Sequence, residues 1–398
     1  MKQQGEPFVF VGTEPQPLRH RPAQGEPVVL HSPAGVEETY EEGQDYLVDY
    51  GAATITRTAD SRIPDWRVHP HYGVKRFDHM QYADGSNTRY TCYADYVRAP
   101  GREAEVLNEA ATARGSRADA ESRLSAASLS AGEPVGASGD EASPIGADVP
   151  SAGLPAEMDE PADASRPGSG TQAGGTQAGA ANAVIMRLQA RLEAGGRLTY
   201  LVLGDSISTG AEASEPALGY PERTAAALRA AHPGTAIRVV NGAVGGENTR
   251  GALARIDEAL VREVAPELVT IGYGMNDQNA RLDGVGNSVP SAEFAANLEE
   301  LIARVRRASE AEIVLLTPCV PNPQWQHASA NVEDYAEAIR AVGRRAGVPV
   351  ADVQPAWLEE LAAGKSHQSL LRNNINHPGD YGHALYAAVL GSLLLWAR

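Results

Sequence analysis

Apolar runs and amphipathic stretches alternate along residues 183–398, and this alternation constrains the fold more than any other feature of the chain. The apolar runs are short and nearly continuous, as in strands that are buried on both faces of a sheet. They lie at 198–203, 237–240, 268–273, 313–317 and 348–353. Helical periodicity fills 220–231, 249–264, 291–308, 332–346 and 381–397. This order predicts an α/β domain with a parallel sheet covered by helices on both faces.

Polar residues follow three of the predicted strands, at the edge where a parallel sheet binds its ligand. Ser206 follows the first strand, a glycine-rich turn at 242–246 follows the second, and Asn276 follows the third. His377 precedes the last helix. Together they contain the parts of an acyl-transfer site, with Ser206 as nucleophile and His377 as the base that takes its proton. The backbone N–H groups of Ser206 and Gly246 and the side-chain amide of Asn276 are the expected donors to an oxyanion.

These segments resemble the four blocks of the SGNH (GDSL-type) hydrolase superfamily, which are named for Ser, Gly, Asn and His. The resemblance covers residues 198–398, with Gly245 as an alternative to Gly246 in the second block. The matching residues are Gly204-Asp205-Ser206, Gly246, Gly274-Met275-Asn276-Asp277 and His377-Pro378 with Gly382-His383 downstream. The resemblance implies a flavodoxin-like α/β/α sandwich built on a parallel sheet.

One position departs from the family pattern, in which the catalytic acid usually lies three residues before the histidine. Asn374 occupies that position here, and an asparagine cannot stabilise an imidazolium by charge. One interpretation is a working dyad of Ser206 and His377, with Asn374 or a backbone carbonyl orienting the imidazole. A second is a displaced carboxylate, for which Asp352 at the end of the fifth strand is the candidate, and a third is an inactive site. Asp380 is less suitable, because it stands where the N-cap of the last helix is expected.

Residues 99–182 have a composition unlike the rest of the chain. No Phe, Tyr or Trp occurs between residues 97 and 199, and the sequence GTQAG is repeated in tandem at 170–174 and 175–179. Residues 101–182 contain five Arg and thirteen Asp plus Glu, so a net charge of −8 out of −17 lies there. Such a segment buries too little apolar surface to offset its conformational entropy. The composition predicts a disordered acidic linker rich in Ala, Gly, Ser and Pro, followed by the α/β domain at 183–398.

Residues 1–98 contain eight of the fourteen tyrosines and predict a small antiparallel β-sandwich. One hairpin is expected at 46–50 and 53–58, and a second at 79–82 and 88–96 across a turn-rich segment. Exposed aromatic side chains of such a domain can bind sugar rings, although alternating aromatics are more typical of core and cross-strand pairs. His69 and His71 lie on one face of an extended segment, but no third ligand is near them in the sequence, so they indicate metal binding only weakly.

Charge and cysteine content exclude several classes of function. A net charge of −17 argues against nucleic acid or an anionic membrane as partner. No apolar run is long enough to span a membrane, and the first residues lack the apolar core of a signal peptide, so we expect a cytoplasmic protein. Cys92 and Cys319 are too few for a disulfide scaffold or a cysteine-rich zinc site. The glycine run at 242–246 lacks dinucleotide-binding spacing, and we expect no cofactor and no metal.

The sequence therefore predicts a serine esterase that acts through an acyl-enzyme intermediate. Resemblance to two-domain members with a β-sandwich before the hydrolase implies O-acetyl groups on a carbohydrate, so the expected partner is a small-molecule or oligosaccharide ester. Two alternatives stay open: a glycan-binding protein with a degenerate hydrolase site, and a lipid or thioester acyl hydrolase. The acyl length, the alcohol and the oligomeric state are left open.

Overall fold

The computed structural model describes residues 1–32, 38–82, 85–100 and 172–395, with side chains from residue 179 onward in the last range. Residues 1–99 and 171–398 form one compact unit. Nearly all of the predicted linker, residues 101–171, lies outside the described residues. The first helix of the α/β domain, α2 (Gln172–Ala194), begins inside the predicted linker, so the expected boundary at 182/183 falls within a helix.

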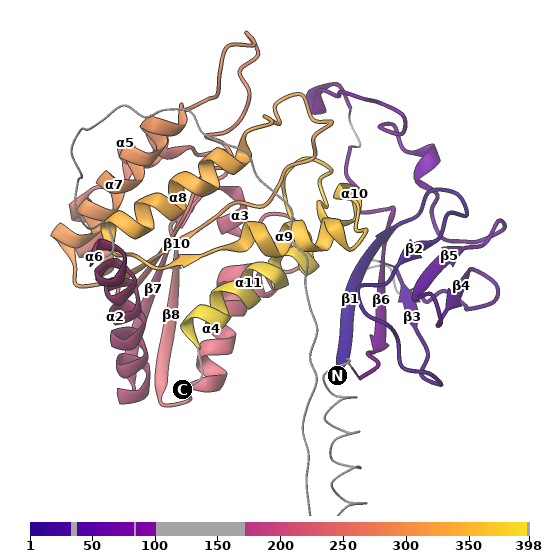
Figure 1. Cartoon of the computed structure of the whole chain (residues 1–398), viewed down its shortest axis with the longest axis horizontal. Helices are drawn as coiled ribbons and strands as arrows, with labels where there is room; N and C mark the ends of the chain where they lie inside the picture. The colour runs from indigo at the N-terminus through magenta and orange to yellow at the C-terminus, as the bar shows by residue number, and fades with distance from the viewer. Residues whose placement is uncertain (33–37, 83–84, 101–171, 396–398) are drawn as a thin grey trace, which may run out of the picture. The chain divides into compact units, whose positions relative to one another are not determined.

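A five-stranded parallel sheet forms the centre of the α/β domain, in the order β11-β10-β9-β7-β8 (Figure 1). The strands are β7 (Gly196–Gly204), β8 (Thr235–Asn241), β9 (Leu268–Gly272), β10 (Glu312–Leu316) and β11 (Val350–Ala351). Alternate residues of β7 enter the two cores: Tyr200 and Val202 lie in one and Leu201 and Leu203 in the other. This alternation gives the predicted α/β/α sandwich.

Helices cover both faces of the sheet. One face packs against α2, α4 (Tyr220–Ala231), α9 (Val353–Ala362), α10 (His367–Leu370) and α11 (Asp380–Leu394). The other packs against α5 (Thr249–Arg255), α6 (Glu258–Val264), α7 (Ser291–Ala308) and α8 (Val332–Ala346). The predicted helix at 249–264 is two helices, because Asp257 begins a new one by accepting a hydrogen bond from Leu260 N at 2.8 Å. Helix α9 was not predicted.

Two three-stranded antiparallel sheets form the N-terminal region, as predicted (Figure 1). One has the order β1-β6-β3 and the other β2-β5-β4, and residues of both share one core. The strands are β1 (Lys2–Val9), β2 (Gln16–Pro17), β3 (Val29–His31), β4 (Tyr46–Asp49), β5 (Thr54–Arg57) and β6 (Thr91–Val97).

The first of the two predicted hairpins is confirmed and the second is wrong. Strands β4 and β5 pair with each other, whereas β6 pairs with β1 and β3. Residues 79–82 do not form a strand. The segment His79–Gln81 is a turn of 3-10 helix (η2), because the Asp78 carboxylate accepts a hydrogen bond from Met80 N at 3.0 Å.

A buried ion pair joins the N-terminal region to the α/β domain. Lys365 Nζ lies 2.5 Å from the Glu6 carboxylate and over the ring of Phe8, and both charged side chains are almost fully buried. Tyr96 donates its hydroxyl proton to the other Glu6 oxygen at 2.6 Å. A second pair, Arg19–Glu360, lies nearby at 3.0 Å. Burial lowers the pKa of Lys365, so its charge depends on Glu6.

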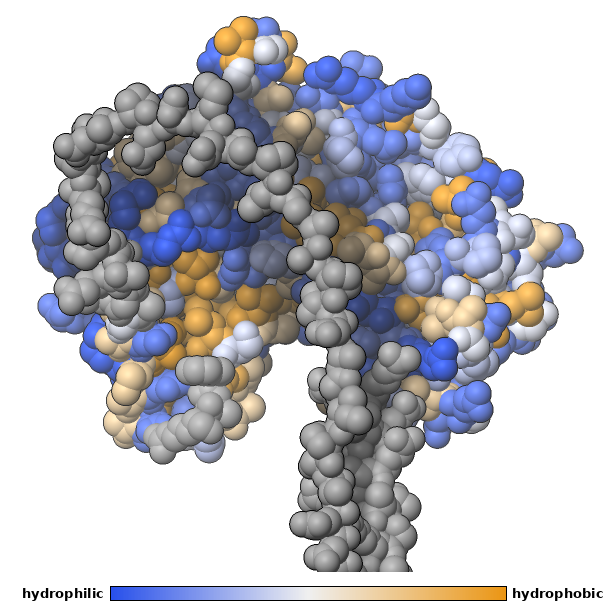
Figure 2. Space-filling model, viewed as in Figure 1, coloured by the Kyte–Doolittle hydropathy of each residue, from blue (hydrophilic) through white to orange (hydrophobic). Residues whose placement is uncertain are grey.

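The surface is mixed, with hydrophobic residues gathered over part of the α/β domain in the view of Figure 2. A groove of about 580 Å³ is lined by residues of α2, β11 and α11. Ile185, Met186 and Leu393 are among these residues. Within the described part of the chain, no helix has the length and apolar character of a membrane span. Cys92 and Cys319 are free thiols, and both are buried.

Candidate active site

The nucleophile candidate Ser206 begins α3 (Ser206–Thr209), directly after β7. The carboxylate of Asp205 caps this short helix by accepting a hydrogen bond from Ile207 N at 2.9 Å. The residue before Asp205 must be a glycine, because a Cβ on Gly204 would collide with Oγ of Ser208 and lie 2.6 Å from the carbonyl oxygen of Gly272. The close approach of β7 to β9 thus places the serine at the end of the strand, as predicted.

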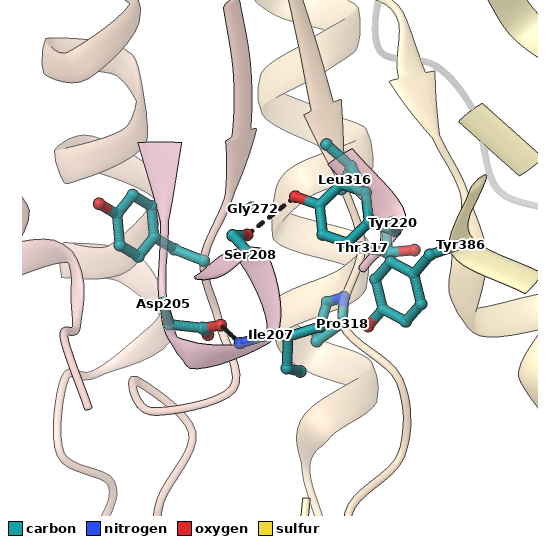
Figure 3. A pocket seen from close by; sticks show the side chains of 10 residues that line it. Asp205, Ile207, Ser208, Tyr220, Gly272, Leu316, Thr317, Pro318 and Tyr386 are labelled. Atoms are coloured by element: carbon teal, nitrogen blue, oxygen red, sulfur yellow. Dashed lines mark hydrogen bonds between the residues drawn. The ribbon is translucent and has the colours of Figure 1, made fainter. Parts of the chain in front are cut away.

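A tightly packed layer of polar and aromatic side chains supports this turn (Figure 3). The hydroxyl of Tyr220 donates to Ser208 Oγ at 2.9 Å. A cavity of only about 10 Å³ remains between Asp205, Tyr220 and Tyr386, which is room for a single water at most. Burial raises the pKa of Asp205 to about 7. Asp205 is buried and caps the backbone of the turn, which indicates a structural role.

The base candidate His377 meets Ser206 across the end of the sheet. Nε2 of His377 lies 2.7 Å from Ser206 Oγ, which is hydrogen-bonding distance for proton transfer between them. The loop that carries His377 is shaped by Asn373, whose side-chain oxygen accepts hydrogen bonds from the N–H groups of Ile375, Asn376 and His377 at 2.9–3.0 Å. The structure therefore brings together the two residues that the sequence placed 171 positions apart.

Burial, with a smaller effect of the nearby His383, lowers the pKa of His377 to about 4. His383 is itself held in the neutral form: Nε2 donates to Ala211 O at 3.0 Å and Nδ1 accepts from Tyr220 N. Burial lowers the pKa of His383 to about 4 as well. His377 and His383 are therefore two neutral imidazoles on this side of the site, and the hydrogen bonds of His383 fix Ala211 and Tyr220.

The lowered pKa of His377 predicts how ester hydrolysis depends on pH. Only a neutral imidazole can accept the Ser206 proton, so kcat/KM should stay level from neutral pH down to about pH 5 and fall about tenfold per unit below pH 4. A pH–rate profile measures this, with the thermal midpoint followed at each pH as control for unfolding. An inflection near pH 6.5, the ordinary value for histidine, would contradict the buried environment.

The expected oxyanion donors line the same pocket as Ser206 and His377. A Cβ on Gly245 would lie 4.0 Å from Ser206 Cβ, so this glycine borders the nucleophile. Gly246 has a φ of +75°, which favours glycine at this position. The Asn276 side chain is fixed by donating to the carbonyl oxygen of Glu247 at 3.0 Å. This leaves its second amide proton for a ligand.

Two buried carboxylates that the sequence did not single out for this purpose hold the oxyanion side in place. Asp277 accepts hydrogen bonds from Thr249 N at 2.9 Å and Gly274 N at 3.2 Å, which joins the third block to the start of α5. Glu247 pairs with Arg255 at 2.7 Å and accepts from the Tyr273 hydroxyl at 2.8 Å. The position of Glu247 after the glycine run was visible in the sequence, but its partners were not.

Asn374 differs from expectation, because it does not contact His377. Its backbone has a φ of +60°, which turns the fully buried side chain toward the N-terminal region. There its amide Nδ2 lies 2.7 Å from His71 Nδ1, and its Oδ1 accepts from Asn322 Nδ2 at 2.9 Å. Because Nδ2 is a donor, His71 accepts this hydrogen bond in its neutral form. Asn374 therefore fixes the loop that carries His377, and not the imidazole itself.

The two carboxylates considered as substitutes for the acid are also engaged elsewhere. Asp352 pairs with Arg340 at 2.8 Å and accepts from the Thr317 hydroxyl at 2.9 Å, and it lines the separate groove between α2 and α11. Asp380 accepts from Ser214 N at 2.7 Å and is the first residue of α11, whose N-cap is Gly379. Among the described residues, none forms an ion pair or hydrogen bond with Nδ1 of His377. The geometry is that of a Ser–His dyad.

The pocket above the dyad has a volume of about 540 Å³, and no Asp, Glu, Lys or Arg of the described residues lines it. Apart from its histidines, the described residues that line it include no ionisable side chain. They are His79, Ser206, Gly245, Gly246, Asn276, Asn279, Trp325, His327, Asn373, Ile375, Asn376 and His377. The sequence missed His79, Asn279, Trp325 and His327, since none belongs to a block at a predicted strand end. The described residues contain no cluster of three or more His, Cys, Asp or Glu that could hold a metal ion.

Comparisons with known proteins find relatives of the α/β domain. Residues 202–385 match the family model described as GDSL-like Lipase/Acylhydrolase family. An acetylxylan esterase of Geobacillus stearothermophilus is 26% identical over 199 residues, covering 47% of this chain and 89% of that protein. Esterase TesA of Pseudomonas aeruginosa is 36% identical over 120 residues, covering 30% of this chain and 53% of that protein.

Among solved structures, a two-domain esterase active on acetylated mannans matches with a TM-score of 0.44 and 22% identity. The match covers 54% of this chain and 52% of that one. This chain thus spans about half the length of TesA and of the two-domain esterase, and most of the length of the acetylxylan esterase.

Proposed function

We propose that the protein is a serine esterase that removes O-acetyl groups from a neutral carbohydrate, on the premise that residues 202–385 match the model of the GDSL-like lipase/acylhydrolase family. The 2.7 Å contact between His377 Nε2 and Ser206 Oγ is the observation that carries the proposal, because it supplies a nucleophile together with its base. The catalytic roles of both residues are part of the proposal.

In the first half-reaction, Ser206 Oγ attacks the ester carbonyl carbon while its proton passes to His377 Nε2. The carbonyl oxygen takes the negative charge and is stabilised by the N–H groups of Ser206 and Gly246 and by the Asn276 amide, with Gly245 N–H as the alternative to Gly246. The bond to the alcohol oxygen then breaks, and this oxygen leaves with the proton from Nε2. Ser206 is left carrying the acyl group.

In the second half-reaction, a water molecule attacks the acyl carbon while it gives a proton to His377 Nε2. The tetrahedral intermediate forms in the same set of N–H donors. When the bond to Ser206 Oγ breaks, Oγ recovers the proton from Nε2 and the carboxylic acid leaves. No step of this cycle needs a group other than the ester, water and the residues of the site.

The lining of the pocket supports a carbohydrate over a thioester. A thioester such as acyl-CoA needs cations for its phosphates, and no Lys or Arg of the described residues lines the pocket. Here the described lining consists mainly of asparagines, histidines and glycines, with Ile375 and Trp325 as its larger apolar residues. Carboxamides and imidazoles are suited to the hydroxyl groups of a neutral polyol. The similarity to an acetylxylan esterase points in the same direction.

A substrate panel tests the proposal. We expect hydrolysis of p-nitrophenyl acetate, a loss of about tenfold or more for the octanoate, and acetate release from acetylated xylo- or manno-oligosaccharides. Acetyl-CoA should be a poor substrate. Rising activity with chain length would instead establish a lipid esterase, and preference for acetyl-CoA a thioesterase. No hydrolysis of any ester, with binding of the oligosaccharide retained, would establish a glycan-binding protein with a degenerate site.

A further inference from the structure

We propose that His79, which belongs to the N-terminal region, contacts the sugar of the ester's alcohol and determines specificity for it, together with Trp325 and His327. This inference rests on the proposed function and extends it to a named substrate subsite. It also gives the N-terminal region a part in the active site, where the sequence predicted a separate domain.

The backbone fixes the segment before His79 against the α/β domain. Phe77 and Trp325 form a β-bridge, in which Phe77 N donates to Gln324 O and Gln326 N donates to Phe77 O, both at 2.9 Å. His79 begins the η2 turn two residues later, next to its capping residue Asp78. Because two backbone hydrogen bonds hold this segment to the loop after β10, His79 is a built part of the pocket wall.

The hydrogen bond that His79 accepts determines which of its ring nitrogens carries the proton. Trp325 Nε1 donates to His79 Nδ1 at 3.1 Å, so a neutral His79 carries its proton on Nε2. Trp325 is 6% exposed, whereas the His79 side chain is 35% exposed, so the tryptophan positions the imidazole and the imidazole stays accessible. His327 lies 6.0 Å from His79 between ring centroids. The wall therefore offers an N–H donor and ring surfaces, which are the groups that bind sugar hydroxyls and C–H faces.

The pocket is much larger than an acetyl group, so the wall formed by His79, Trp325 and His327 faces the alcohol part of the ester. An acetyl group has only three heavy atoms and fills a small part of about 540 Å³. The catalytic pair and the oxyanion donors account for Ser206, His377, Asn276 and the glycines. The wall formed by His79, Trp325 and His327 has no such role and remains for the rest of the substrate, which is the alcohol.

The experiment compares two substrates in the full chain carrying His79→Ala. We expect kcat/KM for an acetylated oligosaccharide to fall roughly tenfold, mainly through KM, while p-nitrophenyl acetate hydrolysis stays within about twofold of wild type. Met80→Ala is the matched control, since Met80 is the next residue, is 81% exposed and does not line the pocket. It should leave both substrates unchanged.

Two results overturn the inference: an equal loss on both substrates, which indicates a merely structural role, and no loss on the oligosaccharide. Failure of the proposed function is distinguishable, because it appears in the wild type as absence of acetate release from the sugar esters. Calorimetric titration of the oligosaccharide into Ser206→Ala, with and without His79→Ala, measures the same contact without turnover. The affinity should fall by a similar factor, and an unchanged affinity contradicts the inference.

Discussion

Ser206→Ala is expected to lower kcat/KM for p-nitrophenyl acetate by about 10²-fold or more. The size of the loss follows from the state of the imidazole. In a full serine-protease triad, loss of the serine or histidine costs about 10⁶-fold and loss of the acid alone about 10⁴-fold. Because the described residues give His377 no carboxylate, the wild-type dyad starts without the acid's contribution. The rate acceleration that serine and histidine still supply together is then about 10⁶ divided by 10⁴, or on the order of 10².

The rate losses caused by Ser206→Ala and His377→Ala are expected not to add up in the double variant. Ser206→Ala, His377→Ala and the double variant should retain the same residual rate, because the two residues act as one unit through the 2.7 Å contact. A fluorophosphonate should label wild type and the control Ser392→Ala, whose serine lies on α11, but not Ser206→Ala. Additive losses in the double variant, or labelling that persists without Ser206, would show that another nucleophile is at work.

Asn374→Ala is expected to lower the free energy of unfolding by about 3–7 kcal/mol. Asn322 and His71 would each lose a hydrogen-bonding partner in a buried place, at about 1–3 kcal/mol apiece. Alanine at a φ of +60° adds about 1 kcal/mol of strain. Chemical denaturation measures the change, and Asn374→Gly is the matched control because it removes the same side chain without the strain. The glycine variant should be more stable than the alanine variant by about 1 kcal/mol.

Asn374→Asp tests the same residue through activity. Its carboxylate is expected to meet His71 and not His377, so the variant should gain no activity and keep the wild-type pH profile. A family-like triad would behave otherwise: kcat would rise by tenfold or more, and the acid inflection of kcat/KM would move up toward neutral pH, because a carboxylate beside the imidazole raises its pKa. That outcome would show that the Asn374 side chain reaches His377 in solution.

Sequence reasoning located Ser206 and Asn276 because strand ends are predictable. The continuous apolar runs predict a parallel sheet, which the structure confirms. In such a sheet the residues that follow the strands lie at one edge, and Ser206 and Asn276 follow two of the strands. The direction of the Asn374 side chain was not predictable, since it depends on a left-handed backbone conformation at one loop residue. His79 was not predictable either. Its place in the pocket depends on a bridge between Phe77 and Trp325, residues far apart in the chain, and no local pattern encodes such a pairing.

The second hairpin failed for a related reason. The turn-rich stretch between 79–82 and 88–96 indicates a hairpin, but the Asp78 carboxylate closes a helical turn at 79–81. A side chain that hydrogen-bonds its own backbone can override strand alternation over so short a stretch. The predicted helix at 249–264 was divided in the same way by Asp257.

The ammonium of Lys365 has a consequence for how the molecule unfolds. Detaching the N-terminal sheets would break the ion pair with Glu6 and remove the Phe8 ring from the ammonium, and it would expose the apolar contacts that the two regions share. A state with one region melted and the other intact is therefore disfavoured. We expect the two regions to unfold as a single cooperative unit, with one heat-absorption peak and no populated half-folded intermediate.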